Sequence, residues 1–334
     1  MQFEFFVPTR ILFGGGTVDE LSSRPLPGRR ALLVISGGRS AKASGAFDKV
    51  YAVTAANGEN YWDFVSAGTG GGRAITNAPL PLVAITTTAG TGSEADATAV
   101  VTNPATGEKI GFVHPGMFPV LSVVDSSLTK GVPPALTAYQ GFDALFHATE
   151  CYVSNKANKM SDMLALTSAG YVSKYLARAV KDGADEEARD GMSFANMLSG
   201  MVMTLSGCTS KHGMEHAMSA LSPSLPHGAG LIMLAPAYYA HMIEAHVCDD
   251  RFCALAKAMG KENCQGPSDF ISVLKKLMSD CGVGGLKMSE YGISPSDFPS
   301  LADNAMSSMK RVFLNDRLPL SREDVIKIYK KSYR

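Results

Sequence analysis

A change of pattern near residue 133 constrains the fold of this chain more than any other feature. Before it, short apolar runs rich in β-branched residues alternate with glycine turns, which is typical of α/β architecture. After it, the sequence is rich in Ala, Leu and Met at helical spacing. We therefore predict an α/β domain over residues 1–133, with an all-helical domain over residues 134–334.

Strand-like runs and helical segments carry this prediction. The strand-like runs are Ala31–Ser36, Pro81–Ala95 and Val120–Asp125. The helical segments are Leu136–Tyr152, Ser161–Val180 and Glu186–Leu205. A chain of 334 residues is long enough for two domains, each with its own core.

Composition excludes several classes of function. The formal net charge is zero with 19% charged residues, so no basic excess favours nucleic acid or an anionic membrane surface. The most apolar stretch, Gly230–Tyr239, is too short to cross a bilayer and contains Pro236. The first residues show no secretory signal pattern, and the six cysteines are scattered without CxxC pairs. We expect reduced thiols and a cytoplasmic protein.

Residues with metal-ligand chemistry gather at two places in the helical half. His212 and His216 are four residues apart, as are Asp143 and His147, so each pair shares one helix face. His227 stands between a proline and a glycine, where we expect a turn. A single pair of this kind is usually explained by packing or by a helix cap. The chain has only seven histidines, so both pairs together indicate a mononuclear site for Fe²⁺, Zn²⁺, Ni²⁺ or Mn²⁺.

Three motifs resemble the iron-dependent (group III) alcohol dehydrogenase family: GFDALFHATECYVS, HGMEHAMSALSPSLPHG and TTTAGTGSEA. The segments FVPTRILFGGG and LPLSREDVIKIYKKSYR are similar to the usual termini of that family, so the likeness spans nearly the whole chain. The resemblance implies a Rossmann-like dinucleotide-binding domain with a parallel sheet, followed by a dehydroquinate synthase-like all-α metal-binding domain. It also implies an NAD(P)-linked enzyme acting on a small alcohol or aldehyde, assembled as a homo-oligomer, a dimer.

The resemblance also assigns roles that spacing leaves open. It implies that the metal ligands are Asp143, His147, His212 and His227. It places His216 near the nicotinamide and substrate, where we expect a catalytic residue that relays a proton. Fe²⁺ and Zn²⁺ suit these ligands about equally by chemistry, and family precedent favours iron.

On the cofactor side, two groups of residues are candidates. The first follows the run Ala31–Ser36: Ser36, Gly37, Gly38, Arg39 and Ser40. NAD-preferring relatives usually carry an acidic residue there, and its absence favours NADP weakly, although a glycine turn with a solvated arginine explains it equally well. The second group is Thr87, Thr88, Gly90 and Thr91, whose hydroxyls and backbone N–H groups would lie beside the pyrophosphate or nicotinamide ribose. Lys109 joins this group because it resembles a family lysine that approaches the cofactor. For Lys109 alone, an exposed turn lysine is the commoner explanation.

One motif of the resembled family is missing. Its pyrophosphate loop, GGGSxxDxxK, should stand between Ser40–Val50 and Tyr61–Asp63, and about fifty residues of the dinucleotide-binding pattern are absent near Val50 and Tyr51. Either the sequence omits a stretch, or the protein lacks it and binds dinucleotide poorly. We favour omission, because a true deletion would remove buried strands of a parallel sheet.

Two other functions remain open at this point. A metal-dependent hydrolase could use the same ligands to activate water, but it would need no dinucleotide loop such as TTTAGTGSEA (Thr86–Ala95, the Thr/Gly loop). A non-catalytic remnant of the family would keep the helical domain and lose dinucleotide binding. The missing loop is the only support for that second alternative.

Overall fold

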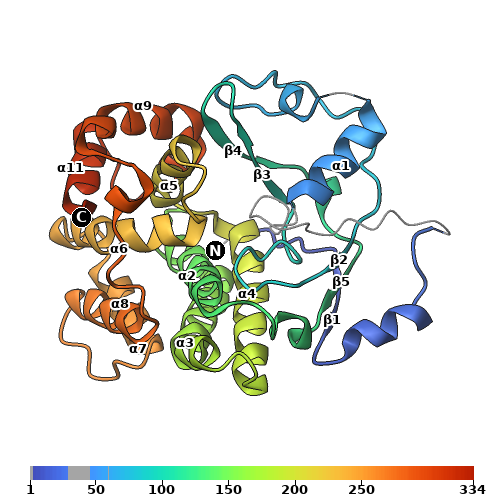
Figure 1. Ribbon diagram of the computed structural model, residues 1–334, viewed down its shortest axis with the longest axis horizontal. Coiled ribbons are helices and arrows are strands. Elements are labelled where there is room, and N and C mark those ends of the chain that lie inside the picture. Colours follow the sequence, from blue (N-terminus) through green and yellow to red (C-terminus); the bar gives the residue numbers. More distant parts are fainter. Residues whose placement is uncertain (1–2, 29–45, 59) are drawn as a thin grey trace.

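The computed structural model describes residues 3–28, 46–58 and 60–334. Figure 1 shows the strands and α1 on one side of the molecule, α5 to α11 on the other, and α2 to α4 between them. The strands are β1 (Arg10–Phe13), β2 (Val83–Ile85), β3 (Thr98–Asn103), β4 (Glu108–Val113) and β5 (Leu121–Val124). The helices are α1 (Ala46–Asn57), α2 (Pro134–Val153), α3 (Lys159–Lys181), α4 (Glu186–Ser206), α5 (Ser210–Leu221), α6 (His227–Glu244), α7 (Asp249–Ala258), α8 (Ser268–Asp280), α9 (Phe298–Ser308), α10 (Lys310–Phe313) and α11 (Arg322–Ser332).

A parallel sheet with the order β1-β5-β2 lies in the first half. The central strand, β5, is buried along its whole length, because a neighbour lies on each side of it. Loops that follow parallel strands meet at one edge of the sheet, which is where ligands bind in such folds. The predicted run Val120–Asp125 is therefore confirmed as a strand, whereas only Val83–Ile85 of the run Pro81–Ala95 pairs. The predicted run Ala31–Ser36 lies outside the described residues.

An antiparallel hairpin, β3–β4, was not predicted from the sequence. Its register pairs Thr98 with Val113 and Asn103 with Glu108. Helix α1 packs on β3, and the buried Lys49 ammonium lies 2.7 Å from the Asp96 carboxylate in front of that strand. Helix α1 runs without a break through residues 50 and 51, where the sequence analysis expects a missing family segment.

The helical half is built around α2, whose side chains are buried from Gly141 to its end. It packs on α3, α4 and α6, and α6 packs in turn on α5 and α11. The helices predicted at Leu136–Tyr152, Ser161–Val180 and Glu186–Leu205 are confirmed as α2, α3 and α4. In the part of the chain that the structure describes, no helix is both long and apolar enough to span a bilayer.

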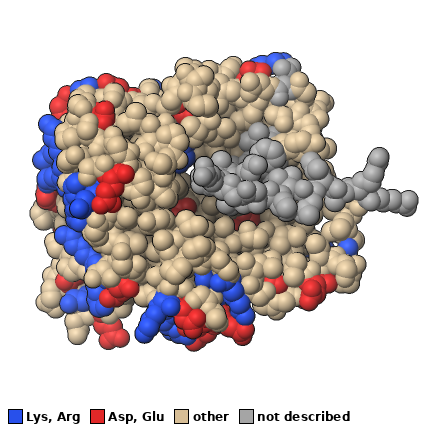
Figure 2. Space-filling view, viewed as in Figure 1, with Lys and Arg blue, Asp and Glu red and all other residues tan. Residues whose placement is uncertain are grey.

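Charged side chains are mixed on the face shown in Figure 2. Lysine and arginine alternate with aspartate and glutamate along the edge of the helical half, and broad uncharged areas lie between them. This distribution agrees with the zero net charge and gives that face no single-sign patch among the described residues.

Candidate metal centre

Four side chains from three helices converge on one point. Asp143 and His147 come from successive turns of α2, His212 from the first turn of α5, and His227 is the first residue of α6. The Oδ1 atom of Asp143 lies 3.4 Å from the Nε2 atom of His147, and 3.5 Å from the Nε2 atoms of both His212 and His227. The four predicted ligands are thus brought together.

These residues fit a divalent ion. Ligand atoms about 2.1 Å from a tetrahedral ion are separated by about 3.4 Å, which matches the distances from the Asp143 oxygen. Asp143 Oδ1 and His212 Nε2 are both buried and have no hydrogen-bond partner among the described residues. Buried polar atoms without partners are costly, and a shared ion would satisfy both of them.

Each of the three histidines has its other ring nitrogen fixed. The Nδ1 atom of His147 lies 3.2 Å from the carbonyl oxygen of Gly90. That of His212 lies 2.7 Å from Glu150 Oε1, and that of His227 contacts Glu215 Oε2. Because a carbonyl or a carboxylate only accepts, each Nδ1 carries the proton and donates. Nε2 of each ring is therefore the atom on the side of Asp143, as metal-ligating histidines require.

Glycines allow the backbones around the site to approach closely. A Cβ atom on Gly228 would lie 2.1 Å from the carbonyl oxygen of Tyr139, so the start of α6 can reach α2 only because residue 228 is a glycine. A Cβ atom on Gly200 would lie 2.1 Å from the carbonyl oxygen of Gly92, which brings the Thr/Gly loop against α4. These contacts place His227, and the loop beside His147, where the site needs them.

Electrostatics favour an ionised carboxylate at Asp143. Burial alone would raise the pKa of Asp143, but His147, His227 and His212 together lower it to about 2. Burial lowers the pKa of His147, and burial with Lys109 holds the pKa of His227 well below its ordinary value. Burial would lower the pKa of His212, but the carboxylates of Glu150 and Asp143 outweigh it and raise that pKa. An incoming ion would therefore displace a proton at His212.

His216 lies beside this cluster. Its Nδ1 atom is 3.2 Å from the carbonyl oxygen of Lys109, and its ring centre is 5.4 Å from that of His227. Burial, together with the Lys109 charge, holds the pKa of His216 well below the ordinary value. The imidazole is therefore neutral, with its proton on Nδ1 and a free lone pair on Nε2.

The Thr/Gly loop of the predicted cofactor side follows β2 at the carboxyl edge of the sheet. Thr87 is exposed, Thr88 and Thr91 are half-buried, and Gly90 is buried against α2. The Thr91 hydroxyl donates to Ser93 Oγ at 3.0 Å. The other candidates, Ser36, Gly37, Gly38, Arg39 and Ser40, lie outside the described residues.

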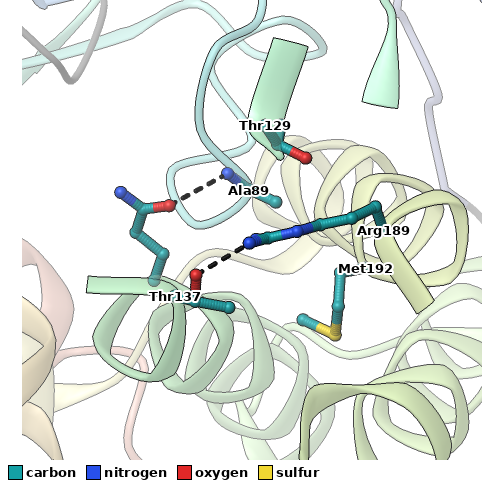
Figure 3. A pocket seen from close by; sticks show the side chains of 6 residues that line it. Ala89, Thr129, Thr137, Arg189 and Met192 are labelled. Atoms are coloured by element: carbon teal, nitrogen blue, oxygen red, sulfur yellow. Dashed lines mark hydrogen bonds between the residues drawn. The ribbon is translucent and has the colours of Figure 1, made fainter. Parts of the chain in front are cut away.

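A small pocket separates the Thr/Gly loop from the helices that hold it (Figure 3). Gln140 on α2 accepts a hydrogen bond from the backbone N–H of Ala89 at 3.4 Å. The buried Arg189 on α4 donates to the Thr137 hydroxyl at 3.0 Å. Gln140 thus anchors the loop to α2, and Arg189 joins α2 to α4 beside it.

Lys109 does not lie in an exposed turn. It belongs to β4, and its ammonium group lies 2.9 Å from the Ser219 hydroxyl, 3.4 Å from Glu215 and 3.3 Å from His227 Nδ1. The explanation of Lys109 as a solvated turn residue is therefore wrong. Its position against α5 brings the first half of the chain to the metal centre.

The carboxylates Glu150 and Glu215 were missed by the sequence reasoning. Each stands three residues after a predicted histidine, Glu150 after His147 and Glu215 after His212. This spacing puts both close to the ligand faces of their helices, and it is the signal that could have found them.

Two family models match the chain. The C-terminal model of the Fe-containing alcohol dehydrogenase family matches residues 137–333, and the iron-containing alcohol dehydrogenase model matches residues 48–126. The chain belongs to the iron-containing alcohol dehydrogenase family. The resemblance drawn from the motifs is confirmed, and the chain is an iron-type alcohol dehydrogenase, an oxidoreductase. These matches do not favour the hydrolase or the remnant.

Curated relatives carry alcohol dehydrogenase names. Alcohol dehydrogenase 4 of Saccharomyces cerevisiae is 31% identical over 302 residues, which cover 90% of this chain and 76% of that protein. The 1,3-propanediol dehydrogenase of Klebsiella pneumoniae is 32% identical over 265 residues, covering 78% of this chain and 67% of that protein. The matched stretch is a smaller share of each relative than of this chain, so both relatives are longer.

A solved structure confirms the fold. The crystal structure of an archaeal halo-thermophilic alcohol dehydrogenase from a Red Sea brine pool has a TM-score of 0.88 and 26% identity, and 99% of each chain is covered. The predicted architecture, a Rossmann-like parallel sheet followed by an all-α region, is therefore correct. The family implies a nicotinamide cofactor and a divalent metal.

Proposed function

We propose that this chain binds one divalent ion, iron in the first place, through Asp143, His147, His212 and His227. With it the enzyme transfers hydride between NAD(P) and a small primary alcohol or aldehyde. The main support is the environment of the Asp143 Oδ1 atom. It is buried, has no hydrogen-bond partner among the described residues, and faces three histidine Nε2 atoms at 3.4 to 3.5 Å. Iron rests on family membership, and zinc is the alternative that the same ligands accept.

The bound ion would act as a Lewis acid on the substrate oxygen. Residues of the chain would orient the metal ligands and accept the alcohol proton. Gly90, Glu150 and Glu215 hold the three imidazoles in the tautomer that leaves Nε2 free. His216, neutral and held by the Lys109 carbonyl, keeps an Nε2 lone pair that can accept the alcohol proton.

Exchanging two histidines one at a time tests these roles. His212→Ala removes a ligand, so we expect loss of the metal measured by elemental analysis. His216→Ala should keep the metal at full stoichiometry and lose turnover, because only the proton acceptor is gone. If both variants kept stoichiometric metal, the ligand assignment would be wrong.

On the dinucleotide, we propose that Thr87, Thr88, Gly90, Thr91 and Lys109 contribute to its site. The loop that carries the first four ends β2 at the carboxyl edge of the sheet, which supports this. We propose NADP rather than NAD, because no acidic residue follows Ala31–Ser36. Comparing KM for NADPH and NADH tests the preference, and a strong preference for NADH would overturn it.

We also propose that the domain boundary lies between residues 133 and 134, that the enzyme is a cytoplasmic homodimer, and that a family segment is missing near Val50 and Tyr51. The relatives' greater length and the family match that begins at residue 48 support the missing segment. A titration of NADPH fluorescence tests its consequence, because a chain that truly lacks the pyrophosphate loop should bind dinucleotide poorly.

A further inference from the structure

A buried ion pair, Glu215–Lys109, links hairpin β3–β4 to the Nδ1 atom of the proposed ligand His227. Glu215 on α5 has a fully buried side chain, and the side chain of Lys109 on β4 is only 15% exposed. Their charged atoms lie 3.4 Å apart. The same oxygen, Glu215 Oε2, accepts from Nδ1 of His227. One carboxylate therefore joins a residue of the first half to a proposed metal ligand.

Helix α6 leaves room for this carboxylate. A Cβ atom on Gly230 would lie 2.8 Å from Glu215 Cγ and 2.9 Å from its Oε1 atom. The glycine lets α6 pass close to Glu215 while His227, one turn earlier, reaches its Oε2 atom. The carboxylate is thus held on three sides, by α5, α6 and β4.

His212 contacts a similar buried ion pair, Glu150–Lys211. Glu150 Oε1 lies 2.7 Å from His212 Nδ1 and 2.9 Å from the buried Lys211 ammonium. Glu150 also accepts from Thr209, so this pair is completed within the helical half. The Glu215 pair differs, because its lysine comes from the hairpin.

Lys109 argues against a second metal site beside the proposed one. Glu215, His216 and His227 offer ligand atoms within 4.8 Å of one another, as a second metal site would require. The Lys109 ammonium lies 3.3 Å from His227 Nδ1 and 3.4 Å from Glu215, so a cation already neutralises this place. A second ion would be repelled by it.

We propose that Glu215 and Lys109 are positioning residues that fix His227 and thereby let hairpin β3–β4 set the affinity of the metal centre. This inference rests on the proposed function. The carboxylate holds the His227 proton on Nδ1 and makes the imidazole a stronger ligand. The lysine keeps the buried carboxylate paired, because an isolated charge there would be strongly destabilising.

Metal dissociation constants, measured by competition with a chelator, test the pair. Glu215→Gln keeps the shape and removes the charge, so the metal should bind roughly 10-fold to 100-fold more weakly. Loss of the Lys109 cation alone would favour the ion, so the weaker binding expected of Lys109→Met would report the lost contact that holds Glu215 against His227, and Lys109→Arg should restore binding. The double variant Glu215→Gln/Lys109→Met should lose no more than the worse single variant, because each single change leaves an unpaired charge.

Glu108→Gln is the matched control. Glu108 is a buried carboxylate next to Lys109 on β4, and it binds the Thr69 backbone rather than a histidine. Its variant should bind the metal within about two-fold of the wild type, since no ligand loses a partner. Melting temperatures of the metal-free proteins show whether each variant folds. If Glu215→Gln does not fold, the comparison of Lys109→Met with Lys109→Arg still tests the inference.

Equal metal affinity in the wild type and Glu215→Gln, or losses that simply add in the double variant, would overturn the inference. The proposed function would then still stand, because the wild type binds its ion. A wild-type protein that bound no divalent ion would overturn both.

Discussion

At the scale of single residues, the buried carboxylates of the metal centre each contact a histidine, and two of them also contact a lysine. Glu150 and Glu215 each have a histidine and a lysine, and Asp143 faces three imidazoles. Asp316 is different. Its Oδ1 atom accepts from the Tyr238 hydroxyl at 2.8 Å and from the Ser210 backbone, while Oδ2 is buried without a partner among the described residues. No cation faces it in these contacts.

Asp316 should therefore make stability depend on pH. Burial raises its pKa to about 7, whereas an unfolded aspartate has a pKa of about 3.9. Between these values the folded protein holds a proton that the unfolded chain has lost, so this carboxyl costs stability as pH rises from about 4 to 7. Compared with Asp316→Asn, the wild type should lose a few degrees of melting temperature between pH 5 and pH 8.

Thermal unfolding of both proteins at the two pH values measures this effect. Asp280→Asn, which changes an exposed carboxylate, serves as the control and should follow the wild type. Parallel melting curves for the wild type and Asp316→Asn would show that Asp316 is ionised at both pH values.

At the scale of elements, the Thr/Gly loop and α4 touch through two glycines. Gly200→Ala would place a methyl group against the Gly92 carbonyl, so the loop must move away from α4. We expect a loss of about 1–3 kcal/mol in the free energy of unfolding and weaker NADPH binding. The metal should be retained, because none of its ligands lies on α4.

Denaturant unfolding and an NADPH fluorescence titration measure these two losses. Gly131→Ala is the control, since a Cβ atom on Gly131 meets nothing within 4 Å. If Gly200→Ala behaved like Gly131→Ala in both measurements, the glycine contact would not position the loop.

Helices were easier to predict from sequence than strands. Leu136–Tyr152 carries a long periodic pattern and folds as α2 almost as expected. The hairpin was missed, because β3 and β4 are short and their outer face is partly polar. Without the hairpin, the place of Lys109 could not be derived.

The candidate site shows the same limit. Spacing within α2 and α5 could pair Asp143 with His147 and His212 with His216, since neighbours on one helix are fixed by its period. It could not choose between His216 and His227, because that choice depends on how α6 approaches α2. Only the resemblance to a family made that choice, and no motif pointed to Glu215.

At the scale of the whole molecule, the metal should be a stabiliser. Its four proposed ligands come from α2, α5 and α6, so unfolding separates them and releases the ion. A free metal concentration 100 times the dissociation constant would add about 2.7 kcal/mol of stability. The melting temperature should fall when a chelator removes the ion and should recover when the ion is returned.

His212→Ala separates this effect from general salt effects. Its melting temperature should not respond to chelator or to added metal, because one ligand is gone. A wild-type protein that also showed no response would contradict a structural contribution of the ion.

Anomalous scattering from one crystal, measured at the iron and zinc absorption edges, tests the central claim most directly. A single peak is expected within bonding distance of Asp143 Oδ1 and of the Nε2 atoms of His147, His212 and His227, about 2.0–2.2 Å from each. The edge at which the peak appears identifies the element. A peak on Glu215, His216 or Cys208 instead, or no peak in a crystal of active enzyme, would contradict the account.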